Sequence, residues 1–479
     1  MTANVATATP PLHMAERGTG GEVRSSVRAV RPARSLCGEV AVPGDKSITH
    51  RAVMLNAIAS GTAVVTGAGL GADCLSTAAC MRALGATVRR RWPDGQLTDD
   101  LRRNPLTGQE ERADAVLVVE GAGLHGLAEP ADVLDAGNSG TTTRLLGGIL
   151  AGQPFFSVLT GDASLRSRPM GRVVQPLRQL GARIAARRGD TLLPLAVSPS
   201  HLAGTQLTMH VASAQLKSCL LLAGLYAGGE TTIKQPEESR DHTERLLRAQ
   251  GASIRQEGLT LRITGHPDLK AVDVAVPGDI SSASFWLVAA CIHPDARVTV
   301  RNVGVNPTRT GIIDVLREMG ATITLANERV EGGEPVADVT AESSRLHGVY
   351  VGGAMIPRLI DEVPVLAVAA TVAEGETTIC DAAELRVKES DRLAATAAEL
   401  RKLGAQVEEL PDGLNVRGGR LRGGEVESYG DHRMAMSLAV AALVASGPVL
   451  IDGGECVDIS YPTFWPDLER LAPGTTREV

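Results

Sequence analysis

Eight cations lie where polar motifs pass into apolar, helix-forming segments. A cation at a helix N-terminus is disfavoured by about 0.3–1 kcal/mol, unless an anion binds there and meets the free backbone amides. Arginine adds bidentate hydrogen bonds to phosphate or carboxylate. In a chain of net charge −7, the pattern predicts two small anionic substrates, or one large one, held between two domains. The cations are Lys46, Arg51, Arg144, Arg168, Arg240, Lys388, Arg392 and Arg433.

The sharpest of these motifs is Gly-Asn-Ser-Gly-Thr-Thr-Thr-Arg at 137–144. A glycine-rich turn before an apolar helix exposes backbone amides, and Gly140 lets a ligand approach where a Cβ would otherwise stand. Thr141 and Arg144 lie one turn apart on the same helix face. The motif lacks the Gly-Lys-Ser/Thr of a P-loop. It predicts a phosphate cradle, although a helix cap by Asn138 and Ser139 explains it equally well.

Polar side chains accompany the cations in the same motifs. Hydroxyl and amide groups could bond a sugar hydroxyl or a phosphate, and each could instead be a helix cap. Two carboxylates, Asp361 and Glu362, immediately precede a long apolar helix, where the helix dipole alone favours acids. Glu389 lies in the charged stretch 386–392, which a solvent-exposed face explains. The hydroxyl and amide candidates are Ser47, Ser213, Gln215 and Ser239.

A recurring Leu-Arg-x-x-Gly-Ala signature indicates repeated elements that must position these residues. A glycine after a helical pattern can end the helix at C′ in the left-handed region, and an apolar, β-branched stretch then predicts a strand. A degenerate sixth copy lies at 468–472. The sequence therefore predicts five or six small α/β units. The glycines of the five clear copies are Gly85, Gly181, Gly251, Gly320 and Gly404.

A second repeated motif divides the chain into halves. Pro-Gly-Asp occurs at 43–45 and again at 277–279, each time between a strand-like run and an apolar helix. A strand–turn–helix corner that recurs for structural reasons, without a chemical role, would give the same pattern. The chain has 479 residues, which is long for one core and sufficient for two domains. We expect the first domain at 46–276 and the second at 277–479.

Composition excludes several classes of protein. Aromatic residues make up 2% of the chain, which disfavours single-stranded nucleic-acid binding, and the negative net charge provides no general field for polyanions. No apolar run reaches the roughly 20 residues that span a bilayer. Seven cysteines without a C-x-x-C pair favour free thiols in a reducing cytoplasm. Residues 1–33 lack an apolar h-region and predict a disordered tail, with an Arg-containing transit peptide as the alternative.

Five motifs occur in order and carry a family resemblance. They are P-G-D-K-S-x-T-H-R from residue 43, G-N-S-G-T-T-T-R-L from 137, S-A-Q from 213, R-V-K-E-S-D-R-L from 386 and Y-G-D-H-R-M-A-M from 429. In this combination, residues 36–471 resemble the 5-enolpyruvylshikimate-3-phosphate synthase family of enolpyruvyl transferases. The resemblance implies an α/β, two-domain inverse α/β barrel with three β-α-β-α-β-β repeats in each domain. Residues 34–45 would join the second domain, and the active site would lie in the cleft.

The resemblance also implies an activity in chorismate and aromatic amino acid biosynthesis. The enolpyruvyl group of phosphoenolpyruvate would move to the 5-hydroxyl of shikimate 3-phosphate, with release of phosphate through a tetrahedral ketal. A cytoplasmic monomer without metal or organic cofactor is expected. The catalytic residues would be Asp361, Glu389 and Lys46. Shikimate 3-phosphate would bind Lys46, Ser47, Arg51, Ser213, Gln215, Ser239, Arg240 (added from its position beside Ser239), Asp361 and Lys388. Phosphoenolpyruvate would bind Lys46, Gly140, Arg168, Gln215, Arg392 and Arg433.

Some positions depart from the family pattern. Ala214 stands where a second serine is common, Glu384 where some members have asparagine, and Glu455 near the place of a late lysine that contacts phosphoenolpyruvate. Ala214 would remove one phosphate contact, and the missing lysine leaves open how the last loop holds phosphoenolpyruvate. Glyphosate resembles the phosphoenolpyruvate cation in this family, and an alanine at the position of Gly140 would crowd it out. The retained glycine therefore predicts a glyphosate-sensitive enzyme.

Three alternatives remain at this point. The sibling transferase that acts on UDP-N-acetylglucosamine carries Lys-Asn where this chain has Lys46-Ser47, and a loop cysteine that is absent between Gly161 and Pro169. A non-catalytic anion-binding protein of the same fold would be expected to lack the acidic pair. An RNA-terminal cyclase uses related units, but the acidic balance and scarce aromatic residues disfavour it.

Overall fold

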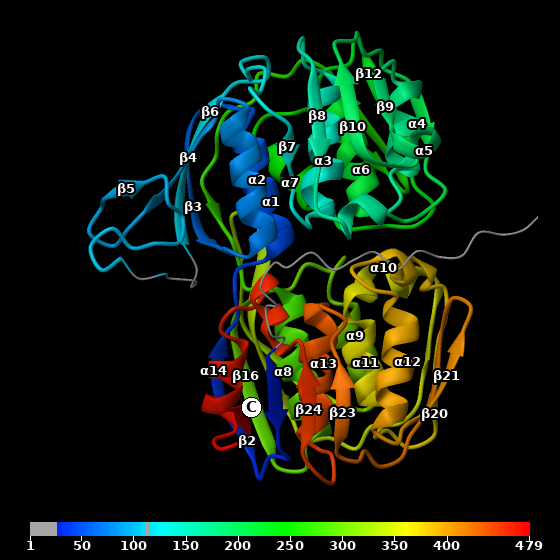
Figure 1. Cartoon of the computed structure of the whole chain (residues 1–479). Helices are drawn as coiled ribbons and strands as arrows, with labels where there is room; N and C mark the ends of the chain where they lie inside the picture. Colours follow the sequence, from blue (N-terminus) through cyan, green and yellow to red (C-terminus); the bar gives the residue numbers. More distant parts are fainter. Residues whose placement is uncertain (1–25, 109, 111–114) are drawn as a thin grey trace, which may run out of the picture.

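The computed structural model describes residues 26–108, 110 and 115–479, which form an α/β fold of two lobes (Figure 1). One hydrophobic core contains buried residues between 48 and 276, and the other contains residues between 30 and 42 together with residues between 280 and 472. We call 46–276 the upper lobe, and 26–45 with 277–479 the lower lobe. The lower lobe thus combines chain segments from both ends of the sequence.

Three sheets of the upper lobe each have one parallel pair of strands at an edge, and their other pairs are antiparallel. Their orders are β15-β3-β6-β4-β5, β7-β8-β10-β9 and β11-β12-β14-β13. The strands are β3 (Ser60–Ala68), β4 (Thr87–Arg91), β5 (Leu97–Thr98), β6 (Ala115–Ala122), β7 (Leu134–Asp135), β8 (Ser157–Thr160), β9 (Arg183–Ala186), β10 (Leu192–Ser198), β11 (Gln206–Thr208), β12 (Glu230–Lys234), β13 (Ile254–Glu257), β14 (Thr260–Thr264) and β15 (Val274–Ala275). The helices are α1 (Lys46–Ala57), α2 (Ala72–Ala83), α3 (Gly140–Ala151), η1 (Leu165–Ser167), α4 (Gly171–Gln179), α5 (Arg187–Asp190), α6 (Ala214–Gly224) and α7 (His242–Ala249).

The lower lobe repeats this arrangement in three further sheets. Their orders are β17-β18-β16-β2, β19-β20-β22-β21 and β23-β24-β1-β25. The strands are β1 (Val27–Val30), β2 (Leu36–Ala41), β16 (Ala296–Gly304), β17 (Thr322–Glu331), β18 (Glu334–Glu342), β19 (Tyr350–Val351), β20 (Glu376–Ile379), β21 (Gln406–Leu410), β22 (Gly413–Arg417), β23 (Gly424–Glu427), β24 (Val449–Asp452) and β25 (Thr476–Glu478). The helices are α8 (Ile280–Ile292), α9 (Gly311–Glu318), η2 (Gly353–Met355), α10 (Ile356–Leu359), η3 (Ile360–Glu362), α11 (Val363–Ala370), η4 (Ala383–Val387), α12 (Arg392–Lys402), α13 (His432–Ala442), η5 (Gly454–Ile459) and α14 (Phe464–Leu471).

Continuously apolar helices form the centre of the lower lobe. Every residue of α11 and of α13 is buried, as are nearly all residues of α8, and the three helices pack against one another. A helix that is apolar on all sides is stable only when neighbouring elements cover it completely. Here the sheets and neighbouring helices provide that cover, and α9, α12 and α14 each bury only part of their surface.

The predicted helix-ending glycines are confirmed. All five have a positive φ, between 85° and 101°. Each follows a helix and precedes a strand, namely β4, β9, β13, β17 and β21. Because other residues avoid this backbone region, the glycine allows the chain to turn directly from helix to strand. The glycines are Gly85, Gly181, Gly251, Gly320 and Gly404.

The prediction of a disordered tail over residues 1–33 is wrong at its C-terminal end. Val27–Val30 forms β1, which pairs antiparallel with both β24 and β25 and is therefore an inner strand of its sheet. Its partners lie more than four hundred residues away, so no local pattern could have indicated the pairing. The rest of that prediction, residues 1–25, lies outside the described residues.

Two crossovers join the lobes and lie side by side. The Asp45 amide donates to the Pro277 carbonyl at 2.8 Å, and the Asp279 amide donates to the Pro43 carbonyl at 2.9 Å. Gly44 must be glycine, because a Cβ there would lie 1.8 Å from the Gly67 carbonyl oxygen. The crossovers bring the N-termini of α1 and α8 to the space between the lobes. No helix in the described part of the chain is long and apolar enough to span a membrane.

Candidate active site

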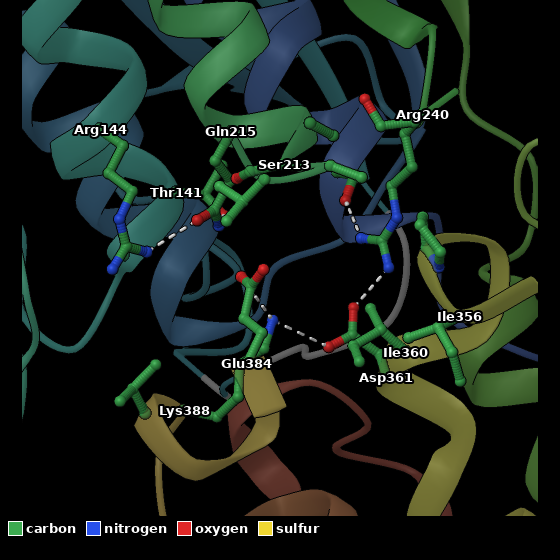
Figure 2. Close-up of a pocket in the computed structure, with 18 of the residues that line it drawn as sticks. Thr141, Arg144, Ser213, Gln215, Arg240, Ile356, Ile360, Asp361, Glu384 and Lys388 are labelled. Carbon is green, nitrogen blue, oxygen red and sulfur yellow. Dashed lines mark hydrogen bonds and ion pairs between the residues drawn. The ribbon is translucent and has the colours of Figure 1, made fainter. Parts of the chain in front are cut away.

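A cavity of about 510 Å³ lies between the lobes and is lined by residues of both (Figure 2). All the residues that the sequence predicts for the site lie within the described chain. The structure brings every one except Arg51 to the cavity wall. These are Lys46, Ser47, Gly140, Arg168, Ser213, Gln215, Ser239, Arg240, Asp361, Lys388, Glu389, Arg392 and Arg433, and the predicted cation Arg144 joins them.

Helix N-termini from both lobes converge on this cavity. Free amides and the helix dipole at each N-terminus favour an anion. Serine and aspartate caps, such as Ser139, Ser213 and Asp45, each bind only one backbone amide of the first turn, so other amides remain available. The wall residues at these N-termini are Lys46 (α1), Gly140 (α3), Ala214 (α6), Asp279 (before α8), Asp361 (before α11) and His432 (α13).

Three side chains form a hydrogen-bonded row on the upper wall (Figure 2). Arg144 Nη1 donates to Gln215 Oε1 at 2.7 Å, and Gln215 Nε2 donates to Thr141 Oγ1 at 2.9 Å. Burial, reinforced by the charges of Arg172 and Arg168, lowers the pKa of Arg144 to about 9. This wall is therefore short of negative charge and would be stabilised by a bound anion.

Asp361 lies among cations from both lobes. Lys388 Nζ is 3.5 Å and Arg392 Nη1 is 3.3 Å from Asp361 Oδ1, while Arg240 of the upper lobe pairs with Oδ2. Burial alone would raise the pKa of this carboxyl, but the cations around it hold that pKa well below its ordinary value. Asp361 is therefore ionised and can accept a proton.

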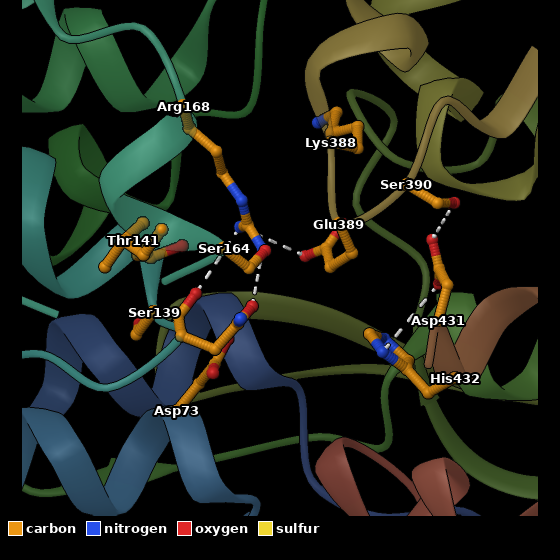
Figure 3. A network of polar contacts seen from close by, with 12 residues as sticks. Asp73, Ser139, Thr141, Ser164, Arg168, Lys388, Glu389, Ser390, Asp431 and His432 are labelled. Carbon is orange, nitrogen blue, oxygen red and sulfur yellow. Dashed lines mark hydrogen bonds and ion pairs between the residues drawn. The ribbon is translucent and has the colours of Figure 1, made fainter. Parts of the chain in front are cut away.

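Glu389 has a similar environment (Figure 3). Arg392 Nη2 lies 2.7 Å from its Oε2, and Arg168 Nη1 reaches across the cleft to within 3.7 Å of its Oε1. Burial opposes ionisation, but these arginines keep the pKa of Glu389 well below its usual range. Two substrate anions that neutralise the same cations would raise both carboxyl pKa values, so each group could then hold a proton during turnover.

Lys46 is held by an acid that the sequence analysis missed. Its Nζ lies 2.7 Å from Asp73 Oδ2, at the N-terminus of α2. Burial would lower the pKa of Lys46, but Asp73 and Glu389 outweigh it and raise that pKa. An acid in the first turn of a helix normally needs no further explanation, so Asp73 gave no distinctive signal.

Two arginines on the wall were also missed. Arg172, at the start of α4, lies 3.3 Å from Glu384 of the lower lobe. Arg309 lies close to the crossovers and contacts Asp279 at 3.3 Å. The sequence could have indicated both arginines by the same rule that indicated the other cations, because each stands next to a predicted helix start.

Arg51 does not line the cavity, and its side chain is hydrogen-bonded within the upper lobe. Its Nη1 donates to the Ser47 carbonyl at 2.9 Å, its Nε donates to Thr243 Oγ1 at 2.7 Å and its Nη2 donates to Ser218 Oγ at 2.8 Å. All three guanidinium nitrogens of Arg51 thus donate hydrogen bonds to groups of the upper lobe. Arg51 therefore supports the backbone of Ser47 at the cavity wall.

Two buried histidines remain neutral near this region. Burial, together with nearby cations, lowers the pKa of His432 to about 3, and burial also holds the pKa of His50 well below 6.5. Neither ring nitrogen of His432 has a hydrogen-bond partner among the described residues. Figure 3 shows this ring beside Asp431, whose nearest oxygen is 4.0 Å away.

Acidification is therefore expected to destabilise the protein before its carboxylates titrate. Below about pH 6.5 the unfolded chain binds protons that the two buried histidines do not, which costs about 1.4 kcal/mol per pH unit for each histidine. Urea unfolding measured between about pH 7 and pH 5 checks this. In His432→Asn the loss should be about half as steep. An unchanged slope would mean that His432 is not a buried neutral group.

Comparisons with known proteins agree with the sequence resemblance. A family model described as EPSP synthase (3-phosphoshikimate 1-carboxyvinyltransferase) matches residues 30–468. The chain belongs to the EPSP synthase family. A 3-phosphoshikimate 1-carboxyvinyltransferase of Synechococcus sp. (strain JA-3-3Ab) is 54% identical over 93% of this chain and 97% of its own. One of Desulforudis audaxviator is 53% identical over 92% and 98%. A solved EPSP synthase from Acinetobacter baumannii superposes with a TM-score of 0.80 at 42% identity, over 95% of this chain and all of that one.

One departure from the EPSP synthase pattern can be located. Glu455 bonds Ser26 rather than reaching the cavity, with Ser26 Oγ donating to its Oε2 at 2.7 Å. Among the described residues, those lining the cavity include none from 454–463. In this structure, the cations of the wall come from elsewhere in the two lobes, including Arg172.

Proposed function

We propose that this cleft transfers the enolpyruvyl group of phosphoenolpyruvate to the 5-hydroxyl of shikimate 3-phosphate and releases phosphate. The activity is that of the family to which the chain belongs. One observation of the site's geometry supports the proposal. Cations of the upper lobe (Lys46, Arg168) and of the lower lobe (Lys388, Arg433) line a single cavity together with two ionised carboxylates. Such a cavity can hold two mutually repelling anions in contact.

The two substrates are assigned to overlapping parts of the wall. Shikimate 3-phosphate is held mainly by upper-lobe hydroxyl, amide and cationic groups, and by Asp361 and Lys388 from below. Phosphoenolpyruvate is held where Arg168, Arg392 and Arg433 face one another. Lys46 and Gln215 contact both substrates. Arg51 acts indirectly, through the carbonyl of Ser47.

The reaction requires that two protons are removed from the substrates and that two are returned to them. The 5-hydroxyl loses a proton as its oxygen bonds to C2 of phosphoenolpyruvate, while the methylene carbon gains one to give the tetrahedral ketal. The C2–O bond to phosphate then breaks as the new methyl group loses a proton and the departing phosphate gains one. Asp361 and Glu389 exchange these protons, and Lys46 with the arginines stabilises the departing phosphate. No step needs a metal or an organic cofactor.

The same proposal includes the division of the fold into repeats and domains. The six sheets are interpreted as six β-α-β-α-β-β repeats, three in each domain of an inverse α/β barrel, with 46–276 as one domain and 34–45 plus 277–479 as the other. The common strand pattern of the sheets supports this. We interpret the enzyme as a monomer of the cytoplasm, which is consistent with its seven unpaired cysteines.

The deciding experiment is phosphate release by the purified protein. Phosphoenolpyruvate with shikimate 3-phosphate should give steady release, whereas phosphoenolpyruvate with UDP-N-acetylglucosamine or alone should give none. Turnover only with the nucleotide sugar would move the chain to the sibling activity. No turnover with either acceptor would leave an anion-binding protein and would refute the proposal.

Gly140 offers a test of where phosphoenolpyruvate binds. A Cβ at this position would lie 2.6 Å from Arg144 Nη1 and 3.8 Å from Arg168 Nη1. Gly140→Ala should therefore raise KM for phosphoenolpyruvate about tenfold, a loss of about 1.4 kcal/mol, because it displaces a cation and fills space. KM for shikimate 3-phosphate should change little.

The same variant tests inhibition by glyphosate. Glyphosate should inhibit the wild type in competition with phosphoenolpyruvate, and Gly140→Ala should weaken that inhibition more than it raises KM. Wild-type turnover that is unaffected by millimolar glyphosate would contradict this expectation.

A further inference from the structure

The crossovers bury two aspartates next to each other. Asp45 Oδ1 accepts the Ile48 amide at 2.9 Å and caps α1, and Asp279 Oδ1 accepts the Ser281 amide at 2.9 Å and caps α8. Asp279 also reaches across the crossover, because the Lys46 amide lies 3.5 Å from its Oδ2. Both side chains are almost inaccessible, and burial together with the charge of Asp279 raises the pKa of Asp45.

One cation joins both aspartates. Arg309, from the loop before α9, lies 3.4 Å from Asp45 Oδ2 through Nη1 and 3.3 Å from Asp279 Oδ1 through Nη2. Its Nη2 also donates to Ser281 Oγ at 2.7 Å and lies 3.9 Å from Glu362 Oε1. The Arg309 side chain is 3% exposed. A single buried guanidinium therefore connects both crossovers to the segment that carries Asp361.

The same cluster continues into the reactive part of the cleft. Lys46 follows Asp45 directly, and Asp361 precedes Glu362. Arg433 Nη1 donates to the Asp361 carbonyl at 3.4 Å and lies 4.0 Å from Glu362 Oε1. Any movement of the two crossovers relative to η3 would therefore change the position of Lys46, in the upper lobe, relative to Asp361, in the lower lobe.

We propose that Arg309 is a positioning residue, which holds Lys46 of the upper lobe in register with Asp361 and Arg433 of the lower lobe by compensating the charges of Asp45, Asp279 and Glu362. The inference rests on the proposed function, since it concerns the geometry of that reaction. Arg309 acts through the carboxylates that it contacts, so its effect depends on their charge. Removing one of those charges should make the arginine partly dispensable.

The test compares Arg309→Gln with the double variant Arg309→Gln/Asp45→Asn in the phosphate-release assay. The single variant buries uncompensated carboxylates, so kcat/KM for both substrates should fall about 10²-fold, the cost of a misplacement of roughly 1 Å. The double variant keeps the wild-type net charge, and asparagine can still cap α1. It should recover about tenfold of the loss. Arg297→Gln removes an exposed arginine paired with Glu342 and should match the wild type.

A pH profile separates positioning from a loss of stability. Asp45 faces Asp279, Arg309, His242 and Arg51, and Asp279 also faces Arg433 and Arg240. Without Arg309, Asp45 and Asp279 should share a proton at low pH and repel each other when it is lost. The activity of Arg309→Gln should therefore fall as pH rises through this new ionisation, and the double variant should regain the profile of the wild type.

The outcomes are distinct. Wild-type protein without turnover would reject the proposed function itself. If Arg309→Gln is folded and retains kcat/KM within about threefold of the wild type, the positioning role is wrong. The role is also wrong if the double variant melts like the wild type but recovers no activity. If Arg309→Gln does not fold, the positioning role is tested by the activity of the double variant and of Arg309→Lys. Both of these variants retain compensated charge.

Discussion

Asp361→Asn is expected to lower kcat by about 10²–10⁴-fold, the usual contribution of a general acid–base group. An amide cannot exchange a proton with the 5-hydroxyl or with the methylene carbon. It still occupies the space between Lys388, Arg392 and Arg240, so the pocket should keep its shape. Phosphate release at saturating concentrations of both substrates measures the effect.

Binding should respond differently from turnover in this variant. Removing a negative charge beside three cations should not weaken the affinity for shikimate 3-phosphate, which isothermal titration can follow. Asp314→Asn, which alters an acid paired with Arg358 outside the cavity, provides the matched control. An Asp361→Asn enzyme with near-normal kcat would remove Asp361 from the proton transfers. A parallel loss of substrate affinity would show that the contact between Asp361 and shikimate 3-phosphate depends on the charge of the carboxylate.

Lys46→Met should reduce kcat/KM for phosphoenolpyruvate by about 10²–10³-fold, as expected when a preorganised cation is removed from a developing charge. Methionine retains the length and the apolar stem of lysine but not its ammonium group. The substitution also leaves Asp73, 2.7 Å from Nζ in the wild type, without its partner and therefore repelling an anion. Initial rates with each substrate varied in turn would give both kcat/KM values.

Lys270→Met is the control for this second variant. Lys270 pairs with Asp268 at the surface, with 63% of its side chain exposed, and should have no effect on catalysis. The double variant Lys46→Met/Asp73→Asn should recover part of the loss, because the unpaired acid is removed. Normal kcat/KM in Lys46→Met would show that substrate phosphate is neutralised from the other side of the cleft.

Local physics explains why much of this site could be predicted from sequence. A cation at the start of an apolar helix is unfavourable unless an anion binds there, and that rule indicated Lys46, Arg144 and Arg433. The helix-ending glycines were equally clear, because a positive φ is a property of one residue rather than of its tertiary contacts. The strand β1 had no such signature, since its partners β24 and β25 are brought to it only by the fold.

Arg51 shows where the local argument fails. Arg51 lies one turn after Ser47 on the same face of α1, so its spacing groups it with the wall residues. The direction of its long side chain is set by partners from distant segments, which the local sequence does not show. The structure directs Arg51 towards Thr243 and Ser218. Asp73 and Arg309 both stand next to a helix start, but neither position shows the partners that give them a role, because those come from other segments of the chain.

The position of β1 between β24 and β25 has a consequence for biosynthesis. During synthesis, residues 46–276 leave the ribosome as one continuous stretch and can complete their own core early. The lower lobe cannot do the same, because β1 and β2 are made first but their partners emerge only after that stretch. Those early strands must wait with unpaired edges, which is when a nascent chain is most exposed to aggregation.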